Sequence, residues 1–175
     1  QALAVLIADM IRRELNIGHY QPTDPEVERV KEEFGLYRGN LQYRPSPPEI
    51  DEIVRACPVM INGESTERIE CAGYGNVRNI DEARIRGGVL LVIGEGMCLK
   101  APKIQKHTER LNLPGWDFIT KFAARGKEKG TKDAKSFRSK QIQPITKFMN
   151  DIIAGRPVFG GPLQAGGFRL RYGRA

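Results

Sequence analysis

The stretch from Arg84 to Leu99, RIRGGVLLVIGEGMCL, joins a pair of arginines to an apolar run that glycines interrupt at Gly87, Gly88, Gly94 and Gly96. Each glycine costs a helix about 1 kcal/mol relative to alanine, so a helix and a strand are both open for this stretch. We favour a helix with a kink at Pro102, whose small residues let it pack closely against a neighbour.

Three helices are expected on the N-terminal side of this stretch. Asp24 followed by Pro25 is a helix-start signal, and Gly35 is expected to end that helix after Phe34. A capping box over 46–49 predicts another helix, ending near Cys57 because the next residue is proline. The first helix is indicated by an apolar stripe at helical spacing: Leu3, Leu6, Ile7, Met10, Ile11 and Leu15.

Two short apolar runs indicate a β-hairpin between these helices and the glycine-rich stretch. Val59–Ile61 is followed by Asn62-Gly63, a tight-turn dipeptide, and 69–72 is the candidate returning strand. Another short helix is expected over 116–124. The fold class expected is α+β: a mostly helical first part with a short β-hairpin, ending in the first strand or strands of a following β-barrel-like domain.

Composition divides the chain into three parts. Residues 1–125 form the expected helical and mixed core domain. Residues 126–146 are expected to be a basic, flexible linker, because they hold too few apolar residues to order themselves. Residues 147–175 are expected to begin the next, truncated domain, with a strand at 168–172. Since the sequence opens inside an amphipathic pattern and stops after that strand, we expect it to be part of a longer protein.

Charge is distributed unequally along the chain. Residues 1–82 hold 9 Lys/Arg and 15 Asp/Glu, a net charge of −6, whereas residues 83–175 hold 19 and 6, a net charge of +13. A basic bias confined to one half favours a polyanion as its partner, although a basic soluble surface is the alternative. No apolar run is long enough for a membrane span, so no membrane partner is expected.

Cysteine usage argues against a disulfide scaffold and against a structural zinc site. The three cysteines, Cys57, Cys71 and Cys98, are widely spaced and lie near no histidine in sequence. They are expected to be buried free thiols in a reducing, cytoplasmic compartment.

No Ser/His/Asp or Cys/His arrangement typical of a catalytic site stands out in the sequence. The carboxylate pairs at 32–33 and 51–52 are expected on solvated helix faces, and no Asp-x-Asp occurs on an expected strand. We therefore predict no catalytic or metal-binding residue in this chain.

Basic residues next to glycines and on expected helix and strand faces are the candidates for binding nucleic acid. Glycines at 87–88 would let an anion approach a helix N-terminus next to two arginines, although a plain tight turn into a helix explains them equally well. Three lysines at three-residue spacing, Lys100, Lys103 and Lys106, could follow a phosphate backbone, although a solvated helix face explains them as well. Arginines alternating along a strand could also follow such a backbone. The candidate DNA-binding residues are Arg84, Arg86, Lys100, Lys103, Arg169, Arg171 and Arg174.

Several blocks together resemble the large subunit of the archaeal family D DNA polymerase, over essentially the whole chain. The last part shows it most clearly, in Gly155–Phe159 followed by Gly166–Arg174. Further blocks occur in matching order: Gln1–Leu3, Leu41–Tyr43, Cys57–Val59, Asp81–Gly88, Glu95–Gly96 and Leu99–Lys103.

The resemblance implies DNA-templated addition of deoxynucleotides to a primer 3′ end, with Mg²⁺ held by aspartates beyond Ala175. It also implies primer–template DNA, a small subunit carrying a 3′–5′ exonuclease, and a sliding clamp as partners. This chain would then supply scaffold and DNA-backbone contacts. Two alternatives are a stand-alone nucleic-acid-binding module without enzymatic activity and a small-molecule phosphate enzyme built on Arg84–Gly88.

Overall fold

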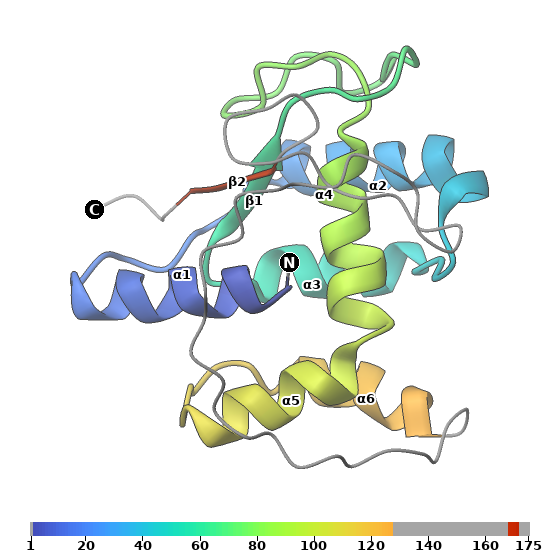
Figure 1. Cartoon of the computed structure of the whole chain (residues 1–175). Coiled ribbons are helices and arrows are strands. Elements are labelled where there is room, and N and C mark those ends of the chain that lie inside the picture. The colour runs from blue at the N-terminus through green and yellow to red at the C-terminus, as the bar shows by residue number, and fades with distance from the viewer. Residues whose placement is uncertain (1, 128–167, 172–175) are drawn as a thin grey trace, which may run out of the picture.

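The computed structural model of the chain describes residues 2–127 and 168–171 (Figure 1). More than half of these residues are helical, as expected, and no helix among them is long and apolar enough to cross a bilayer. In chain order the elements are α1 (Ala2–Glu14), α2 (Asp24–Tyr37), the 3₁₀ turn η1 (Arg38–Asn40), α3 (Pro47–Ala56), β1 (Met60–Gly63), α4 (Gly87–Leu91), the π-helix η2 (Val92–Cys98), α5 (Ala101–Arg110), α6 (Ile119–Lys127) and β2 (Phe168–Arg171).

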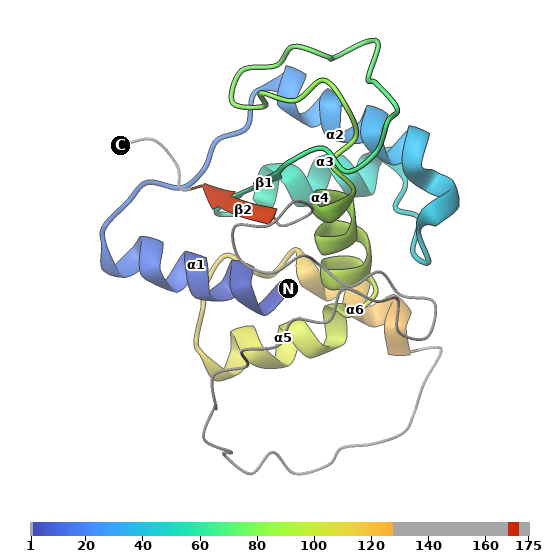
Figure 2. The same ribbon diagram turned by 45° about the horizontal axis from the view of Figure 1, so that its top comes forward.

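The glycine-rich stretch forms the central helix of the fold. Helix α4 continues directly into η2, and Figures 1 and 2 show them as one column with α1, α2 and α3 around it and the α5–α6 pair at its far end. Every residue from 87 to 98 is buried except Glu95. A Cβ on Gly94 would lie 3.4 Å from the Tyr43 carbonyl oxygen, and one on Gly96 would lie 3.5 Å from Ala2. The preference for a closely packed helix is thus confirmed, although Pro102 lies in the first turn of α5 rather than at a kink.

Local capping chemistry starts α2 and α3. Ser46 caps α3 in a reciprocal box with Glu49, as the sequence predicts, and the helix ends before Cys57. Helix α2 is capped by Thr23 rather than Asp24, because Glu26 reaches back to the Thr23 amide. Gly35 does not end α2, which runs on to Tyr37 and buries that ring. Helix α6 begins and ends three residues later than the expected 116–124.

The predicted hairpin is wrong. Strand β1 contains Asn62 and Gly63 within its extended run and pairs antiparallel with β2, with Met60 opposite Arg171 and Gly63 opposite Phe168. The Asn62 side chain is buried, and it donates a hydrogen bond to the Asn79 carbonyl oxygen at 3.0 Å. The stretch 69–72 is attached to residues 83–85 through a single bridge, Glu70 with Arg84.

The described residues thus hold one two-stranded sheet, and no barrel is seen in them. The strand expected at 168–172 is confirmed over 168–171. Most of the expected linker and of the barrel-like domain lies outside the described residues, and so does Arg174.

A buried ion-pair network joins α2 to the beginning of the central helix. Glu33 accepts from Arg29 Nε at 2.7 Å and from Arg86 Nε at 2.9 Å, and none of the three side chains is more than 1% exposed. Arg86 also donates to Asn62 Oδ1 of β1 at 2.7 Å. One carboxylate therefore connects α2, β1 and α4 in the interior of the protein.

The irregular segment 64–86 is held to α2 mainly by Arg29. Arg29 Nη1 donates to the carbonyls of Tyr74 and Gly75, and Nη2 donates to those of Glu82 and Arg84. Glu32, on the same helix, accepts from two amides of this segment. Backbone groups without a sheet partner are thus satisfied by α2 side chains, as buried polar groups require.

Helix α1 does not bury the stripe that its sequence predicts. Of the six stripe residues only Leu6 is buried, and the other five are 36–63% exposed. The buried face instead contains Val5, Asp9 and Arg12. Asp9 accepts from Trp116 Nε1 at 2.9 Å and from Arg12 Nε at 2.8 Å, so a polar contact with a distant tryptophan holds this face toward the core.

Glu33→Gln should destabilise the 175-residue chain by about 3–5 kcal/mol, because it leaves two buried guanidinium groups without their counter-charge. Urea unfolding followed by circular dichroism measures this free energy. Glu28→Gln is the matched control on the same helix, since Glu28 is 42% exposed and pairs only with Lys31. Its loss should stay below about 1 kcal/mol. Equal losses in the two variants would contradict the role given to Glu33.

Candidate nucleic-acid interface

Helix α5 carries a cationic face opposite its buried face. Ala101, Ile104 and Thr108 are buried, whereas Lys103 and Lys106 are exposed. Arg110 is exposed as well, and its spacing of seven and four residues from the two lysines puts it on the same face. Of the three lysines that share a three-residue spacing in the sequence, Lys103 and Lys106 therefore lie on this face, and Arg110 joins them. Lys100, which immediately precedes the helix, is partly buried.

The cations of this face are not neutralised by their surroundings. None of Lys103, Lys106 and Arg110 forms an ion pair with another described side chain, whereas Arg55 on α3 pairs with both Asp24 and Asp51. The hydrogen bond from Lys31 lowers the pKa of Asp51, with a further contribution from Arg55. Arg55 is thus matched with acids, whereas the three cations grouped on α5 leave a net positive strip.

Arg84 lies far from this strip. It is exposed at the end of segment 64–86, and its carbonyl is held by Arg29 Nη2 and by Ser65 Oγ. The column of α4 and η2 separates it from α5, at roughly 1.5 Å per residue over a dozen residues (Figure 1). Arg84 and the lysines therefore do not form one continuous patch.

Arg86 cannot serve as a surface contact in this structure. Its side chain is 1% exposed and is bound to Glu33 and Asn62. A charged residue is buried in this way only when a partner of opposite charge is present, and Glu33 provides it. We therefore remove Arg86 from the candidate DNA-binding residues.

The helix start at Gly87 does not offer an open anion site either. The Gly87 amide donates to Thr66 Oγ1 at 3.0 Å, and a Cβ on this glycine would lie 2.6 Å from that oxygen. Glycine is thus required by the close approach of Thr66. The hypothesis that Arg84–Gly88 binds phosphate therefore loses two of its donors, the Arg86 side chain and the Gly87 amide.

Strand β2 brings the C-terminal arginines into register with β1. Arg169 lies opposite Asn62, and Arg171 lies opposite Met60. The sheet therefore places the backbone of this basic strand directly beside the buried core strand. The contacts of these two arginine side chains lie outside what the structure describes.

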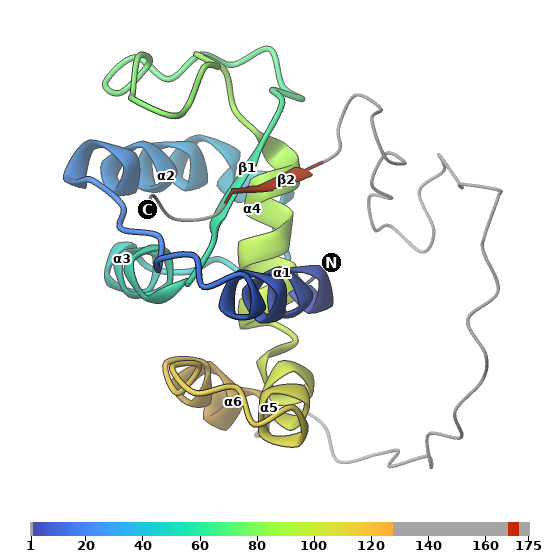
Figure 3. The same cartoon turned by 90° about the vertical axis from the view of Figure 1, so that its left-hand side faces the viewer.

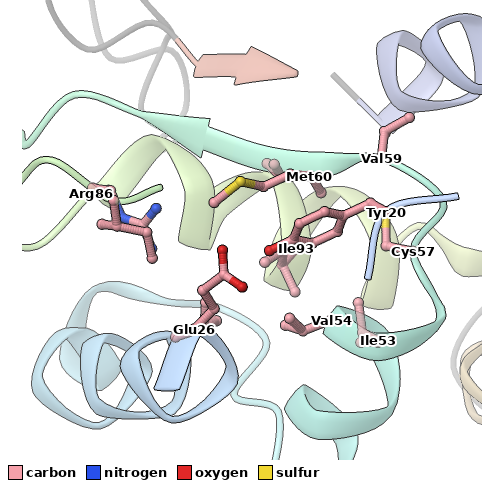
Figure 4. A pocket seen from close by; sticks show the side chains of 12 residues that line it. Tyr20, Glu26, Ile53, Val54, Cys57, Val59, Met60, Arg86 and Ile93 are labelled. Atoms are coloured by element: carbon pink, nitrogen blue, oxygen red, sulfur yellow. The ribbon is translucent and has the colours of Figure 1, made fainter. Parts of the chain in front are cut away.

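A small cavity lies between α2, α3, β1 and the central helix (Figure 4). Its polar groups are Tyr20, Glu26 and Arg86, and the rest of the lining is mainly aliphatic. Arg86 Nη2 is the buried side-chain atom that has no hydrogen-bond partner among the described residues. The volume of about 30 Å³ corresponds to one or two water molecules, so the cavity does not accommodate a nucleotide.

The ionisable groups of this cavity are poorly suited to catalysis. Burial, reinforced by the nearby Glu26, raises the pKa of Tyr20. Burial would also raise the pKa of Glu26, but hydrogen bonds from Asn79 and Thr23 outweigh it and keep this pKa below its ordinary value. Burial raises the pKa of the Cys57 thiol to about 12. Tyr20 and Cys57 thus stay protonated and Glu26 ionised near neutral pH. Among residues 2–127 and 168–171, no three His, Cys, Asp or Glu side chains gather closely enough to hold a metal ion.

Comparisons with known proteins identify the family. Residues 1–125 match the N-terminal family of the DNA polymerase II large subunit DP2, and residues 132–175 match the central-domain family of the same subunit. The chain belongs to the DP2 large-subunit family.

Individual relatives agree over the full length of this chain. It is 50% identical to the DNA polymerase II large subunit of Methanocella arvoryzae, 48% identical to that of Methanosarcina barkeri and 45% identical to that of Archaeoglobus fulgidus. Each alignment covers 100% of this chain but 15% of the relative. The chain thus spans about one-seventh of the length of these DP2 relatives.

Sequence reasoning missed two features of this DP2 segment. Arg110 could have been found, because its spacing from Lys103 and Lys106 is visible in the sequence. The burial of Arg86 could not, because it depends on Glu33, more than 50 residues earlier.

The three thiols should resist modification in the native chain. Burial raises the pKa of Cys57 to about 12 and that of Cys71 to about 11, and it raises that of Cys98 as well, so little thiolate exists at pH 8. We expect reaction with dithionitrobenzoate at pH 8 to be at least about 100-fold slower than for a free cysteine. All three cysteines should react in guanidinium chloride.

Ala72→Cys is the matched control for this measurement, since Ala72 is exposed beside the buried Cys71. Its new thiol should react at the rate of a free cysteine. Rapid reaction of any of the three original thiols in the native chain would show that this thiol is not buried.

Proposed function

We propose that this chain is an N-proximal portion of the large subunit of a replicative DNA polymerase of the archaeal family D type. The full-length subunit would add deoxynucleotides to a primer 3′ end under the direction of a template. Support comes from the two DP2 family matches in chain order and from relatives at 45–50% identity named DNA polymerase II large subunit.

The role proposed for the described residues is to hold DNA by its backbone and to give the subunit a rigid scaffold. The observation that carries this role is the strip of exposed cations on α5, Lys103, Lys106 and Arg110, without acidic partners among the described side chains. Cations three and four residues apart on one helix face can contact successive phosphates without reading base sequence. The buried opposite face keeps the strip fixed against α6 and η2.

Further contacts with the DNA backbone are proposed at other basic residues. Arg84 would form a separate contact at the opposite end of the central helix, and Lys100 would extend the α5 strip. Arg169, Arg171 and Arg174 are proposed from the alternation of their sequence, with β2 carrying the first two.

Catalysis is proposed to reside elsewhere in the full-length subunit. Mg²⁺ would serve the nucleotidyl transfer, but the described residues do not fit a site for it, since they offer no cluster of three metal-ligating side chains. We propose primer–template DNA, a small subunit with 3′–5′ exonuclease activity and a sliding clamp as partners, in the cytoplasm. The isolated chain is expected to be inactive.

Replacing Lys103, Lys106 and Arg110 together by glutamine in the full-length large subunit should weaken its binding to primer–template DNA. Each lost phosphate contact should reduce the slope of log K against log salt by about 0.9, hence by up to about 2.7 in all. Fluorescence anisotropy of labelled DNA across a salt series measures both quantities.

Arg55→Gln is the control, because it also removes an exposed cation, but one that pairs with Asp24 and Asp51. It should leave the salt slope unchanged. If the triple variant kept the original affinity and slope, α5 would not be a DNA contact.

A further inference from the structure

Helix α1 presents an apolar face that no described element covers. Leu3, Ile7, Met10 and Ile11 are 46%, 55%, 36% and 44% exposed, and Leu15, just beyond the helix, is 63% exposed. Their spacing of three to four residues puts them on one side of the helix. Figure 1 shows α1 at the left-hand side of the molecule, with the strands above it and the α5–α6 pair below it, and Figure 3 shows that side turned toward the viewer.

We propose that this face of α1 is the docking site for an apolar segment of the same full-length polypeptide that lies outside residues 1–175. The segment would present leucine-like side chains at helical spacing to the four residues of α1. This inference requires only that the chain belongs to a longer subunit, and it does not depend on the DNA contacts proposed for α5.

The size of the face argues for a docking role. Five half-exposed aliphatic side chains in one row leave roughly 400 Å² of apolar surface together, within the range in which surface patches are often functional. The row is also held rigidly. Asp9 and Arg12 fix the opposite side of α1, and Ala2 packs on Gly96 of η2. A rigid face loses little conformational freedom when a partner binds.

Charge excludes nucleic acid as the occupant. Neither lysine nor arginine lies within the row, and the exposed residue that follows on the same side is Glu14. A polyanion would therefore meet apolar groups and a like charge. The segment that docks is expected to place a lysine or arginine near Glu14.

Area argues against a second copy of the chain. A symmetric dimer through this face would bury roughly 800 Å² in total, below the value of about 1,000 Å² expected of a stable interface between separate molecules. A segment of the same polypeptide does not face this limit, because its tether raises its effective concentration. The relatives are long enough to contain such a segment, since this chain spans 15% of their length.

Photo-crosslinking in the full-length large subunit tests the proposal. With p-benzoylphenylalanine in place of Ile7, irradiation should join α1 to a peptide of the same polypeptide from outside residues 1–175, identified by mass spectrometry. The control puts the same group at Leu36 on α2, which is 45% exposed but lies outside this row. It should give no such product.

Three results would overturn the proposal: a product of twice the subunit mass, which would mean a second copy; a crosslink to residues 128–167; or no crosslink at Ile7 above that at Leu36. Loss of polymerase activity is not a readout, so the outcome is independent of the proposed function. A second measurement is thermal unfolding of the full-length subunit. Ile7→Glu should lower its melting temperature by a few degrees, and Leu36→Glu should leave it unchanged.

Discussion

The Glu33 carboxylate is the contact on which most of the described fold depends. Arg29 and Arg86 both donate to it, and each then extends the connection, Arg29 to the carbonyls of segment 64–86 and Arg86 to Asn62 of β1. Burying two guanidinium groups is unfavourable unless they are paired and hydrogen-bonded. The glutamate therefore makes possible both the attachment of a long irregular segment and the junction of β1 with the central helix.

This arrangement explains which parts of the fold the sequence could predict. The start of α3 is encoded within four residues, where Ser46 and Glu49 cap each other, and it was predicted correctly. The partner of β1 was not, because Met60 pairs with Arg171, more than 100 residues away. Asn62-Gly63 is typical of a turn when isolated. Here Arg86 binds the asparagine side chain and the dipeptide stays extended.

The candidate interface likewise combines features that local spacing predicts with features that depend on distant residues. Helical spacing alone was enough to bring Lys103 and Lys106 together, and it would have been enough for Arg110. Burial of a charged side chain depends on residues that are distant in sequence. The local sequence pattern therefore does not predict the burial of Arg86 against Glu33 or of Asp9 against Trp116. The apolar row of α1 is a further case, since a stripe at helical spacing does not reveal whether it faces the core of its own domain or another part of the protein.

The π-helical geometry of η2 has a consequence for how the two ends of the molecule are oriented. A turn of this kind is what an α-helix becomes when one residue is added to it. Removing one residue between Val92 and Cys98 would restore ordinary helical winding and leave the direction of α5 nearly unchanged, because the wide turn absorbs the extra residue. Removing one residue from α4, which has no such turn, would rotate everything after it by about 100°. The direction in which the α5 cations point, relative to Arg84 and the strands, should thus tolerate the loss of one residue from η2 but not from α4.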